Sequence, residues 1–176
     1  MGEDCKLKVG LALGSGGARG FVHVGVLKVL EEASIGVSAI AGCSMGGIIG
    51  ALYAGGLSID EIRRLHLAKV VLRTPRPSLS IKGLLSAQPM EEFIRSTIGD
   101  VQFEDLGIPL AITTLDLKKR ERVVLQTGSV AKAVRATVSV PPVFQPVRWD
   151  DHELYDAWYI DPVPMDVPFD LGADVV

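Results

Sequence analysis

The sequence predicts an α/β fold with a mainly parallel sheet, and two successive units of the same kind indicate it. In each unit an apolar run of strand length leads through a glycine-rich turn into an apolar helix. The first unit covers residues 6–33 and the second covers residues 37–53. Because neighbouring parallel strands end at the same edge of a sheet, we expect the two glycine turns to lie side by side.

The bulk composition is that of one compact domain over residues 1–176. The chain has 176 residues, of which 48 % are hydrophobic and 22 % charged, and its mean hydropathy is +0.32. A chain of this length can bury about 70 % of the surface exposed in the unfolded state, and the apolar content excludes disorder. The net charge of −3 gives no general attraction to nucleic acid.

The sequence also carries signals about location. No apolar run reaches the ~18 residues of a membrane span, and the first residues lack the basic and apolar regions of a signal peptide. Lys6 departs from the myristoylation pattern. The two cysteines, Cys5 and Cys43, form no disulfide framework, so a reducing compartment is the simpler interpretation. We therefore expect a cytoplasmic protein, which could contact a membrane peripherally.

The second glycine turn has the pattern Gly-x-Ser-x-Gly, formed by Gly42, Ser44 and Gly46. A serine at the tip of a sharp strand-to-helix turn is typical of a nucleophile elbow. The serine backbone is strained there, and the glycines let the strand and the helix pass closely. Cys43 and Met45 occupy the variable positions of the motif, and the helix that begins near Met45 directs its amide dipoles at the serine oxygen.

The first unit begins with residues 6–13, which alternate and then become continuously apolar from Val9, as expected for a central strand buried on both faces. The glycine turn at residues 14–20 then opens a helix and so forms an anion cradle. A dinucleotide site would need a third glycine where Arg19 stands and an acid where Gly42 ends the next strand. The phosphate-loop pattern is absent as well, so a nucleotide site is disfavoured.

The same glycine turn suits an oxyanion hole better. The amides of Gly16 and Gly17, joined by that of Met45, could hold the negative oxygen of a tetrahedral intermediate formed at Ser44. Each well-placed donor of this kind contributes about 3 kcal/mol to the transition state.

The middle of the chain is mainly structural. Ser58 and Glu61 form a capping box that predicts a helix through about Leu72, on which His66 is expected to be structural. Residues 73–86 read as a loop with apolar side chains. This loop could be a lid or a lipid-facing flap, although packing onto the body of the protein is the simpler interpretation.

Further elements are predicted from turn and capping residues. They are a helix over residues 89–98 ended by Gly99, strands over 110–115 and 122–126, a helix capped by Ser129, a rigid segment at 139–144 and a strand pair around Asp150 and Asp151. Asp156 follows at an expected strand end, where a sheet presents its functional side chains. Residues 172–176 read as a helix stop and the start of another buried strand, so we expect a truncated form of a longer protein.

In the order and spacing of these motifs, the chain resembles the patatin-like phospholipase family over residues 9–176. The resemblance rests on the turn at 14–20 with His23 and Gly25 behind it, the elbow at 42–46, residues 139–144, and Asp156 with residues 162–164. It implies a three-layer α/β/α sandwich with a mainly parallel central sheet and a single patatin-like domain. It also implies hydrolysis of fatty acyl esters of phospholipids, lysophospholipids or neutral lipids, without metal or cofactor.

The resemblance implies a Ser-Asp dyad in which Ser44 is the nucleophile and Asp156 the acid, acting through an acyl-enzyme. It assigns the oxyanion hole to Gly16, Gly17, Ala18 and Arg19. The lipid class, the acyl chain length and the oligomeric state are not determined by the sequence.

A histidine-using triad is the alternative arrangement of the site. The chain has only His23, His66 and His152, and His23 is expected to be a structural contact behind the glycine turn. The order serine, acid, histidine could hold only with His152 and an acid such as Asp116 or Asp150.

One departure from the family pattern favours a different function. Family members usually carry Asp-Gly-Gly or Asp-Gly-Ala where this chain has Asp156, Ala157 and Trp158. If a positive φ is required after the acid, Ala157 is strained by about 1 kcal/mol or more. Trp158 could crowd the pocket. The alternative is therefore a catalytically weak or inactive module with a binding or regulatory role.

Overall fold

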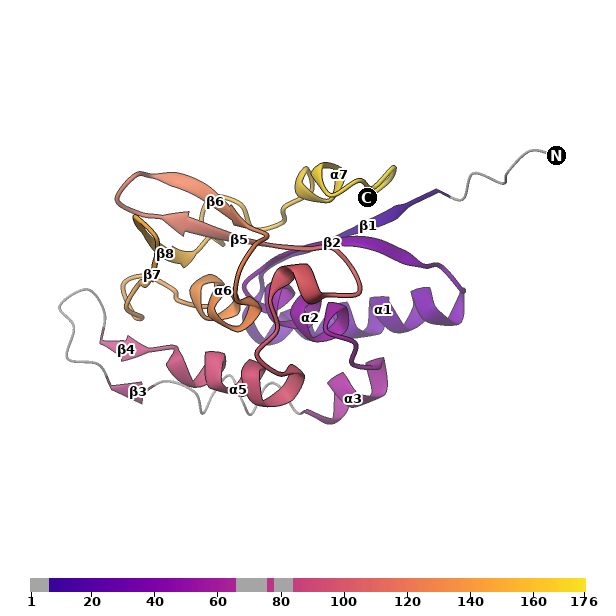
Figure 1. Cartoon of the computed structure of the whole chain (residues 1–176), viewed down its shortest axis with the longest axis horizontal. Coiled ribbons are helices and arrows are strands. Elements are labelled where there is room, and N and C mark those ends of the chain that lie inside the picture. The colour runs from indigo at the N-terminus through magenta and orange to yellow at the C-terminus, as the bar shows by residue number, and fades with distance from the viewer. Residues whose placement is uncertain (1–6, 66–75, 78–83) are drawn as a thin grey trace.

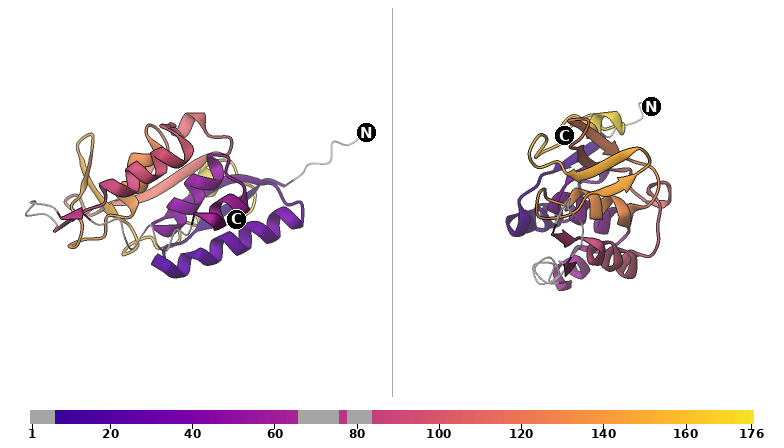
Figure 2. Two further views of the ribbon diagram at one scale, coloured as in Figure 1. Left: turned by 90° about the horizontal axis from the view of Figure 1, so that it is seen from below. Right: turned by 90° about the vertical axis from the view of Figure 1, so that its left-hand side faces the viewer.

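The computed structural model describes residues 7–65, 76–77 and 84–176 as a twisted six-stranded sheet flanked by helices (Figure 1 and Figure 2). The strand order is β1-β2-β5-β8-β7, with β6 paired to β5. The strands are β1 (Val9–Leu13), β2 (Val37–Cys43), β5 (Leu110–Asp116), β6 (Glu121–Leu125), β7 (Val147–Trp149) and β8 (His152–Asp156). The first three strands of the order are parallel, and the other pairings are antiparallel.

Strand β5 is paired along both of its edges. One edge pairs with β6, and the other is shared by β2 and β8. Strand β2 pairs with the first half of β5 up to the pair Cys43–Thr113. Strand β8 runs the other way and pairs with the second half, beginning at Asp156–Thr114. Because β6 pairs with residues 112–116 from the opposite side, β2 and β8 meet end to end along one edge of β5. The carboxyl ends of β2 and β8 are thereby brought together.

Most helices lie on one face of the sheet, below it in Figure 1. These are α1 (Val22–Glu32), α2 (Met45–Ala54), α3 (Ile59–Arg64), α5 (Gln88–Ile98) and α6 (Val130–Thr137). The short helix α7 (Val167–Asp170) lies on the opposite face, where Val167 packs against Ala41 and Ala111. The remaining short elements are η1 (Gly17–Phe21), β3 (Arg76–Pro77), β4 (Leu85–Ser86) and η2 (Phe103–Asp105). The expected α/β/α arrangement is confirmed.

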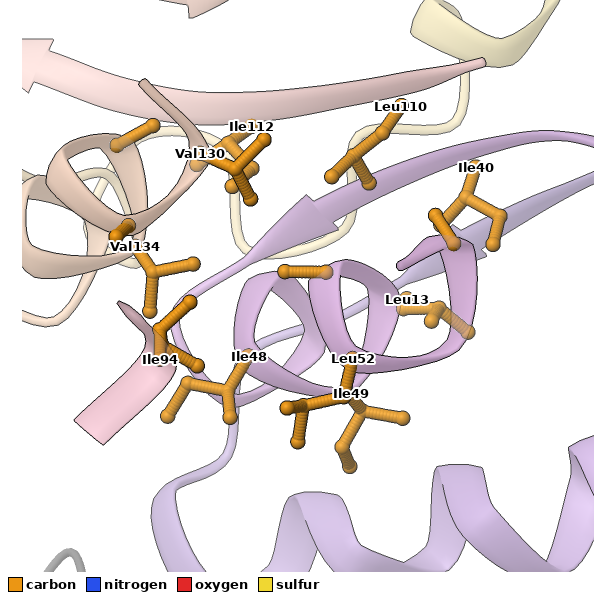
Figure 3. Packing of buried hydrophobic residues seen from close by; sticks show 14 of the residues in the cluster. Leu13, Ile40, Ile48, Ile49, Leu52, Ile94, Leu110, Ile112, Val130 and Val134 are labelled. Atoms are coloured by element: carbon orange, nitrogen blue, oxygen red, sulfur yellow. The ribbon is translucent and has the colours of Figure 1, made fainter. Parts of the chain in front are cut away.

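Helix α2 is the centre of the hydrophobic core (Figure 3). Nine of its ten residues are buried, because it lies between the sheet and the outer helices. Ile48 and Leu52 of α2 share the main cluster with Ile40 and Ile112 of the sheet and with Ile94 of α5. A helix that is apolar on all sides is typical of such an enclosed position.

The predicted caps and turns are confirmed in detail. The capping box of Ser58 and Glu61 starts α3, and the Ser129 side chain accepts a hydrogen bond from the Lys132 amide at the start of α6. Gly99, with φ of 88°, ends α5. The predicted continuation of the α3 helix to Leu72, His66 and most of the apolar loop at 73–86 lie outside the described residues.

Strand β1 departs from the prediction. It was expected to be a central strand buried on both faces, but it lies at the edge of the sheet, and only Gly10 and Leu13 are buried. Its outer side meets the end of the chain, where Val175 forms a parallel bridge with Val9 and accepts a hydrogen bond from the Gly10 amide at 2.8 Å. Within the described ranges, no helix is both long and apolar enough to cross a membrane.

Candidate active site

The predicted elbow has the expected geometry. Ser44 lies between β2 and α2 with φ of 54° and ψ of −118°, a combination that non-glycine residues rarely adopt. A Cβ on Gly42 would come within 2.7 Å of the backbone of Gly46 and Gly47, and one on Gly46 would overlap the carbonyl of Leu13. Both glycines are therefore required for the strand and the helix to pass this closely.

A threonine holds the strained serine backbone in place. The Ser44 amide donates to the Oγ1 of Thr137 at 2.8 Å, and the Thr137 hydroxyl donates to the carbonyl oxygen of Thr113 at 2.8 Å. Thr137 is buried at the end of α6, so this connection ties the elbow to both α6 and β5. The sequence carried no signal for this role, because Thr137 is distant from the elbow in the chain.

Asp156 ends β8 beside the elbow and is 1 % exposed. Its amide donates to the Ser139 carbonyl at 2.9 Å. Its Oδ1 accepts hydrogen bonds from the Trp158 amide at 2.9 Å and from the Cys43 thiol at 3.7 Å. Its Oδ2 is buried and has no hydrogen-bond partner among the residues that the structure describes. The carboxylate thus has one fixed oxygen and one unpaired oxygen.

Burial dominates the electrostatics of this carboxylate. Removal from water raises the pKa of Asp156 to about 6, and the Ser44 hydroxyl, the Trp158 amide and the Cys43 thiol oppose this shift by stabilising the charged form. The Ser44 hydroxyl is near enough to stabilise the charged carboxylate, although Oδ2 itself has no hydrogen-bond partner among the described residues. Catalytic hydrogen bonds are often loose before substrate binds. A carboxyl with such a pKa can serve as a general base at neutral pH.

The glycine turn beside β1 lies next to the elbow. Gly16 has φ of 151° and Gly17 has φ of 52°, both of which glycine adopts readily. Among the described residues, neither glycine amide donates a hydrogen bond to a backbone carbonyl, whereas the Arg19 amide donates to the Gly16 carbonyl at 3.1 Å. The Arg19 side chain is exposed. The two glycine amides are therefore available to a bound anion.

An apolar cavity of about 170 Å³ opens beside the serine. Ser44 and Gly17 lie at its wall, and the remaining lining is apolar, including Met45, Ile48, Met90, Val138, Val140 and Phe144. The segment at 139–144 was predicted to be a rigid wall beside a site, and Val140 and Phe144 have this position. A cavity of this composition suits an alkyl chain rather than a polar group.

The family model for patatin-like phospholipases matches residues 11–169 of the chain. The chain belongs to the patatin-like phospholipase family. An NTE family protein of Mycobacterium tuberculosis is 38 % identical over 173 residues, which cover 96 % of this chain and 47 % of that protein. Lysophospholipase nte1 of Aspergillus fumigatus is 35 % identical over 181 residues, covering 98 % of this chain and 12 % of that protein. The chain thus spans about half the length of the mycobacterial relative.

A solved structure shows the same fold. The crystal structure of VipD from Legionella pneumophila superposes on this patatin-like domain with a TM-score of 0.65 at 15 % sequence identity. The similarity covers 89 % of this chain and 46 % of that protein. At this level of identity the likeness concerns the fold alone.

Among the residues that the structure describes, neither His23 nor His152 of this patatin-like domain is hydrogen-bonded to Ser44. His152 Nδ1 lies 2.9 Å from Asp116 Oδ2, so the pair that a triad would need does form. However, His152 begins β8 and Asp156 ends it, which separates them by about 13 Å along the strand. His23 Nε2 instead contacts the Gly14 carbonyl oxygen at 2.8 Å, the structural role that was predicted for it.

The unusual residues after Asp156 do not strain the patatin-like site. Ala157 is fully buried without a positive φ, so the strain considered for this position does not arise. Trp158 is 44 % exposed and is not part of the cavity wall. Arg122 donates to Asp161 at 3.0 Å and to Asp166, which fastens the following segment to β6.

Proposed function

We propose that this chain is a serine acyl hydrolase that cleaves fatty acyl esters of lipids through an acyl-enzyme on Ser44. One observation carries the proposal: the carboxylate of the buried Asp156, whose Oδ2 has no hydrogen-bond partner among the described residues, is within range of the Ser44 hydroxyl, and an apolar cavity opens beside Ser44. A base, a nucleophile and a site for an alkyl chain are therefore adjacent.

The reaction begins when the Asp156 carboxylate accepts the proton of the Ser44 hydroxyl and Ser44 Oγ attacks the acyl carbonyl carbon. The negative oxygen of the tetrahedral intermediate is held by the amides of Gly16 and Gly17, assisted by the amino end of α2 at Met45. Collapse of the intermediate breaks the ester bond, and the leaving alkoxide takes the proton from Asp156. Asp156 then accepts a proton from the water that attacks the acyl-enzyme. It returns this proton to Ser44 Oγ when the second tetrahedral intermediate collapses and releases the fatty acid.

In the proposed oxyanion hole, Ala18 and Arg19 support the glycine turn and do not bind the oxyanion themselves. The Arg19 amide is already engaged with the Gly16 carbonyl at 3.1 Å, so it stabilises the turn rather than the oxyanion.

The substrate we propose is a lipid ester with a single acyl chain in the cavity. A comparable apolar cavity of about 150 Å³ accommodates benzene, so about 170 Å³ holds on the order of six carbons next to the ester. The relative named a lysophospholipase supports a single-chain lipid as the substrate class.

We further propose that the protein contacts a lipid surface through apolar side chains that follow Asp156. Trp158 and Tyr159 stack edge to face with ring centres 4.9 Å apart, and Tyr159 is 74 % exposed. Aromatic side chains of this kind favour the interface between lipid and water. The same segment reaches the glycine turn, because the Ser15 amide donates to the Pro162 carbonyl at 2.8 Å.

The test is labelling of the protein with a fluorophosphonate probe, followed by turnover on p-nitrophenyl esters of increasing chain length. Ser44→Ala should abolish labelling, and Asp156→Asn should slow it by at least a hundredfold. Ser96→Ala is the matched control, because Ser96 is an exposed serine whose hydroxyl donates to the Phe93 carbonyl. If the wild-type protein stays unlabelled, the binding or regulatory module is the correct function.

A further inference from the structure

The two oxygens of the Asp156 carboxylate have different surroundings. Oδ1 accepts from the Trp158 amide and from the Cys43 thiol, whereas Oδ2 has no hydrogen-bond partner in the described part of the chain. A buried carboxylate oxygen without a partner is costly, so its presence calls for a reason. The asymmetry suggests that one oxygen is kept in place while the other is kept free.

Strand register explains why a cysteine reaches this carboxylate. Cys43 lies opposite Thr113 and Asp156 lies opposite Thr114, so the ends of β2 and β8 occupy consecutive positions along β5. Cys43 is fully buried and packs against Leu115 and Ala157 on the face away from α2. Its side chain is therefore fixed by packing and by the sheet.

The surroundings also determine the chemical form of the thiol. Burial raises the pKa of Cys43 well above its usual range, and the charge of Asp156 raises it further. The thiol therefore stays protonated at neutral pH, which makes it a hydrogen-bond donor to Oδ1. It is not a competing nucleophile, because the thiolate is the nucleophilic form.

We propose that Cys43 is a positioning residue for the dyad: its thiol and the Trp158 amide hold Oδ1 of Asp156, which leaves Oδ2 to receive the Ser44 proton. This rests on the proposed function of Ser44 and Asp156. Two donors on one oxygen oppose rotation of the carboxylate about its Cβ–Cγ bond. They also stabilise the ionised form that the buried base needs before it can accept a proton.

The proposal is tested in the full-length protein with Cys43→Ala, which removes the donor, and Cys43→Ser, which keeps one. For Cys43→Ala we expect kcat/KM to fall roughly three- to tenfold near pH 6 and less than twofold near pH 8. Loss of the donor destabilises the ionised carboxylate, so the fall of kcat/KM at low pH should begin at a higher pH than in the wild type. Cys43→Ser should keep the wild-type profile. An equal loss at every pH in both variants would mean that Cys43 only fills space, and the proposal would be wrong.

Two further readouts distinguish a failure of this proposal from a failure of the proposed function. The pKa of Asp156, followed by ¹³C NMR of its carboxyl carbon, should rise in Cys43→Ala and not in Cys43→Ser, whether or not the protein turns over substrate. In a Cys5→Ala background Cys43 is the only thiol, and its infrared S–H stretching band should shift when Asp156→Ala removes the acceptor. An unchanged band would overturn the proposal even if Cys43→Ala fails to fold. Absence of fluorophosphonate labelling in the wild-type protein would instead overturn the proposed function.

Discussion

The Cα of Gly46 lies directly against the backbone carbonyl of Leu13, so a methyl group on Gly46 would overlap the carbonyl oxygen. Leu13 ends β1 just before the glycine turn, and Gly46 lies in the first turn of α2. The two glycine turns that the sequence predicts to be neighbours are thus in van der Waals contact. A side chain at position 46 would therefore push the elbow away from the start of the first glycine turn.

Gly46→Ala should therefore destabilise the protein strongly. Overpacking against backbone atoms typically costs up to about 3 kcal/mol, because the backbone cannot move aside as a flexible side chain can. The free energy of unfolding, measured by urea titration, should fall by about this amount, and fluorophosphonate labelling should be lost. Gly25→Ala in α1 is the matched control, because nothing lies within 4 Å of its added Cβ. It should stabilise the protein by about 0.5–1 kcal/mol, so equal stabilities of the two variants would contradict the packing described here.

The pH dependence of hydrolysis should report the ionisation of Asp156. The carboxyl acts as a base only when it is ionised, and burial raises its pKa to about 6. The value of kcat/KM should therefore be constant above about pH 7 and fall about tenfold per unit below about pH 6. If kcat/KM instead begins to fall only near pH 4, the ordinary pKa range of aspartate, the carboxylate is hydrated during turnover.

Replacement of the same residue should stabilise the fold at neutral pH. Because the pKa of Asp156 is raised in the folded state, its contribution to stability is fully present below about pH 4 and is lost as the pH rises through about 6. The free energy of unfolding should therefore fall by about 3 kcal/mol between these pH values, as follows from the difference between the raised and the ordinary pKa of the carboxyl. Asp156→Asn should thus have a higher midpoint of thermal unfolding than the wild type near pH 8 and a similar one near pH 4. The exposed Asp170→Asn should show no such pH-dependent gain.

Removal of the Thr137 hydroxyl should slow the reaction by releasing the elbow. Thr137→Val leaves the Ser44 amide without its acceptor and the Thr113 carbonyl without its donor. Each unsatisfied buried group costs about 1–3 kcal/mol, and a displaced nucleophile should lower kcat at least tenfold. Thr137→Ser keeps the hydroxyl and should keep most of the labelling rate. Equal rates in the two variants would show that the hydroxyl does not position Ser44.

Contact with lipid should depend on the aromatic pair after Asp156, Trp158 and Tyr159. The double variant Trp158→Ser, Tyr159→Ser should sediment less with phosphatidylcholine vesicles, because two exposed aromatic side chains are lost. The backbone hydrogen bond from Trp158 to Asp156 is unaffected by the side chain, so turnover of soluble esters should persist. Val22→Ser, Val29→Ser on α1 is the control, since these residues are 65 % and 62 % exposed. An equal effect of both double variants would mean that vesicle binding is non-specific.

Local signals in the sequence determined most of the elements. Capping by Ser58 and Ser129, the stop at Gly99 and the glycines of the elbow act over a few residues, so they can be recognised without knowledge of the fold. The position of Ser44 on a strained turn follows from the same kind of signal. The prediction that β1 is a central strand was wrong, because an apolar pattern indicates that a strand is buried but does not specify its position in the sheet.

The sequence by itself thus determined the family, the elbow and the residues that compete for the role of acid. Only the tertiary structure showed that Asp156 ends beside the elbow while Asp116 pairs with His152, and only it brought Cys43 and Thr137 to the site. Cys43 and Asp156 are 113 residues apart in the chain, and they meet because β8 pairs with β5 in the antiparallel direction, end to end with β2. Such a meeting depends on strand register across the sheet, which no local pattern specifies.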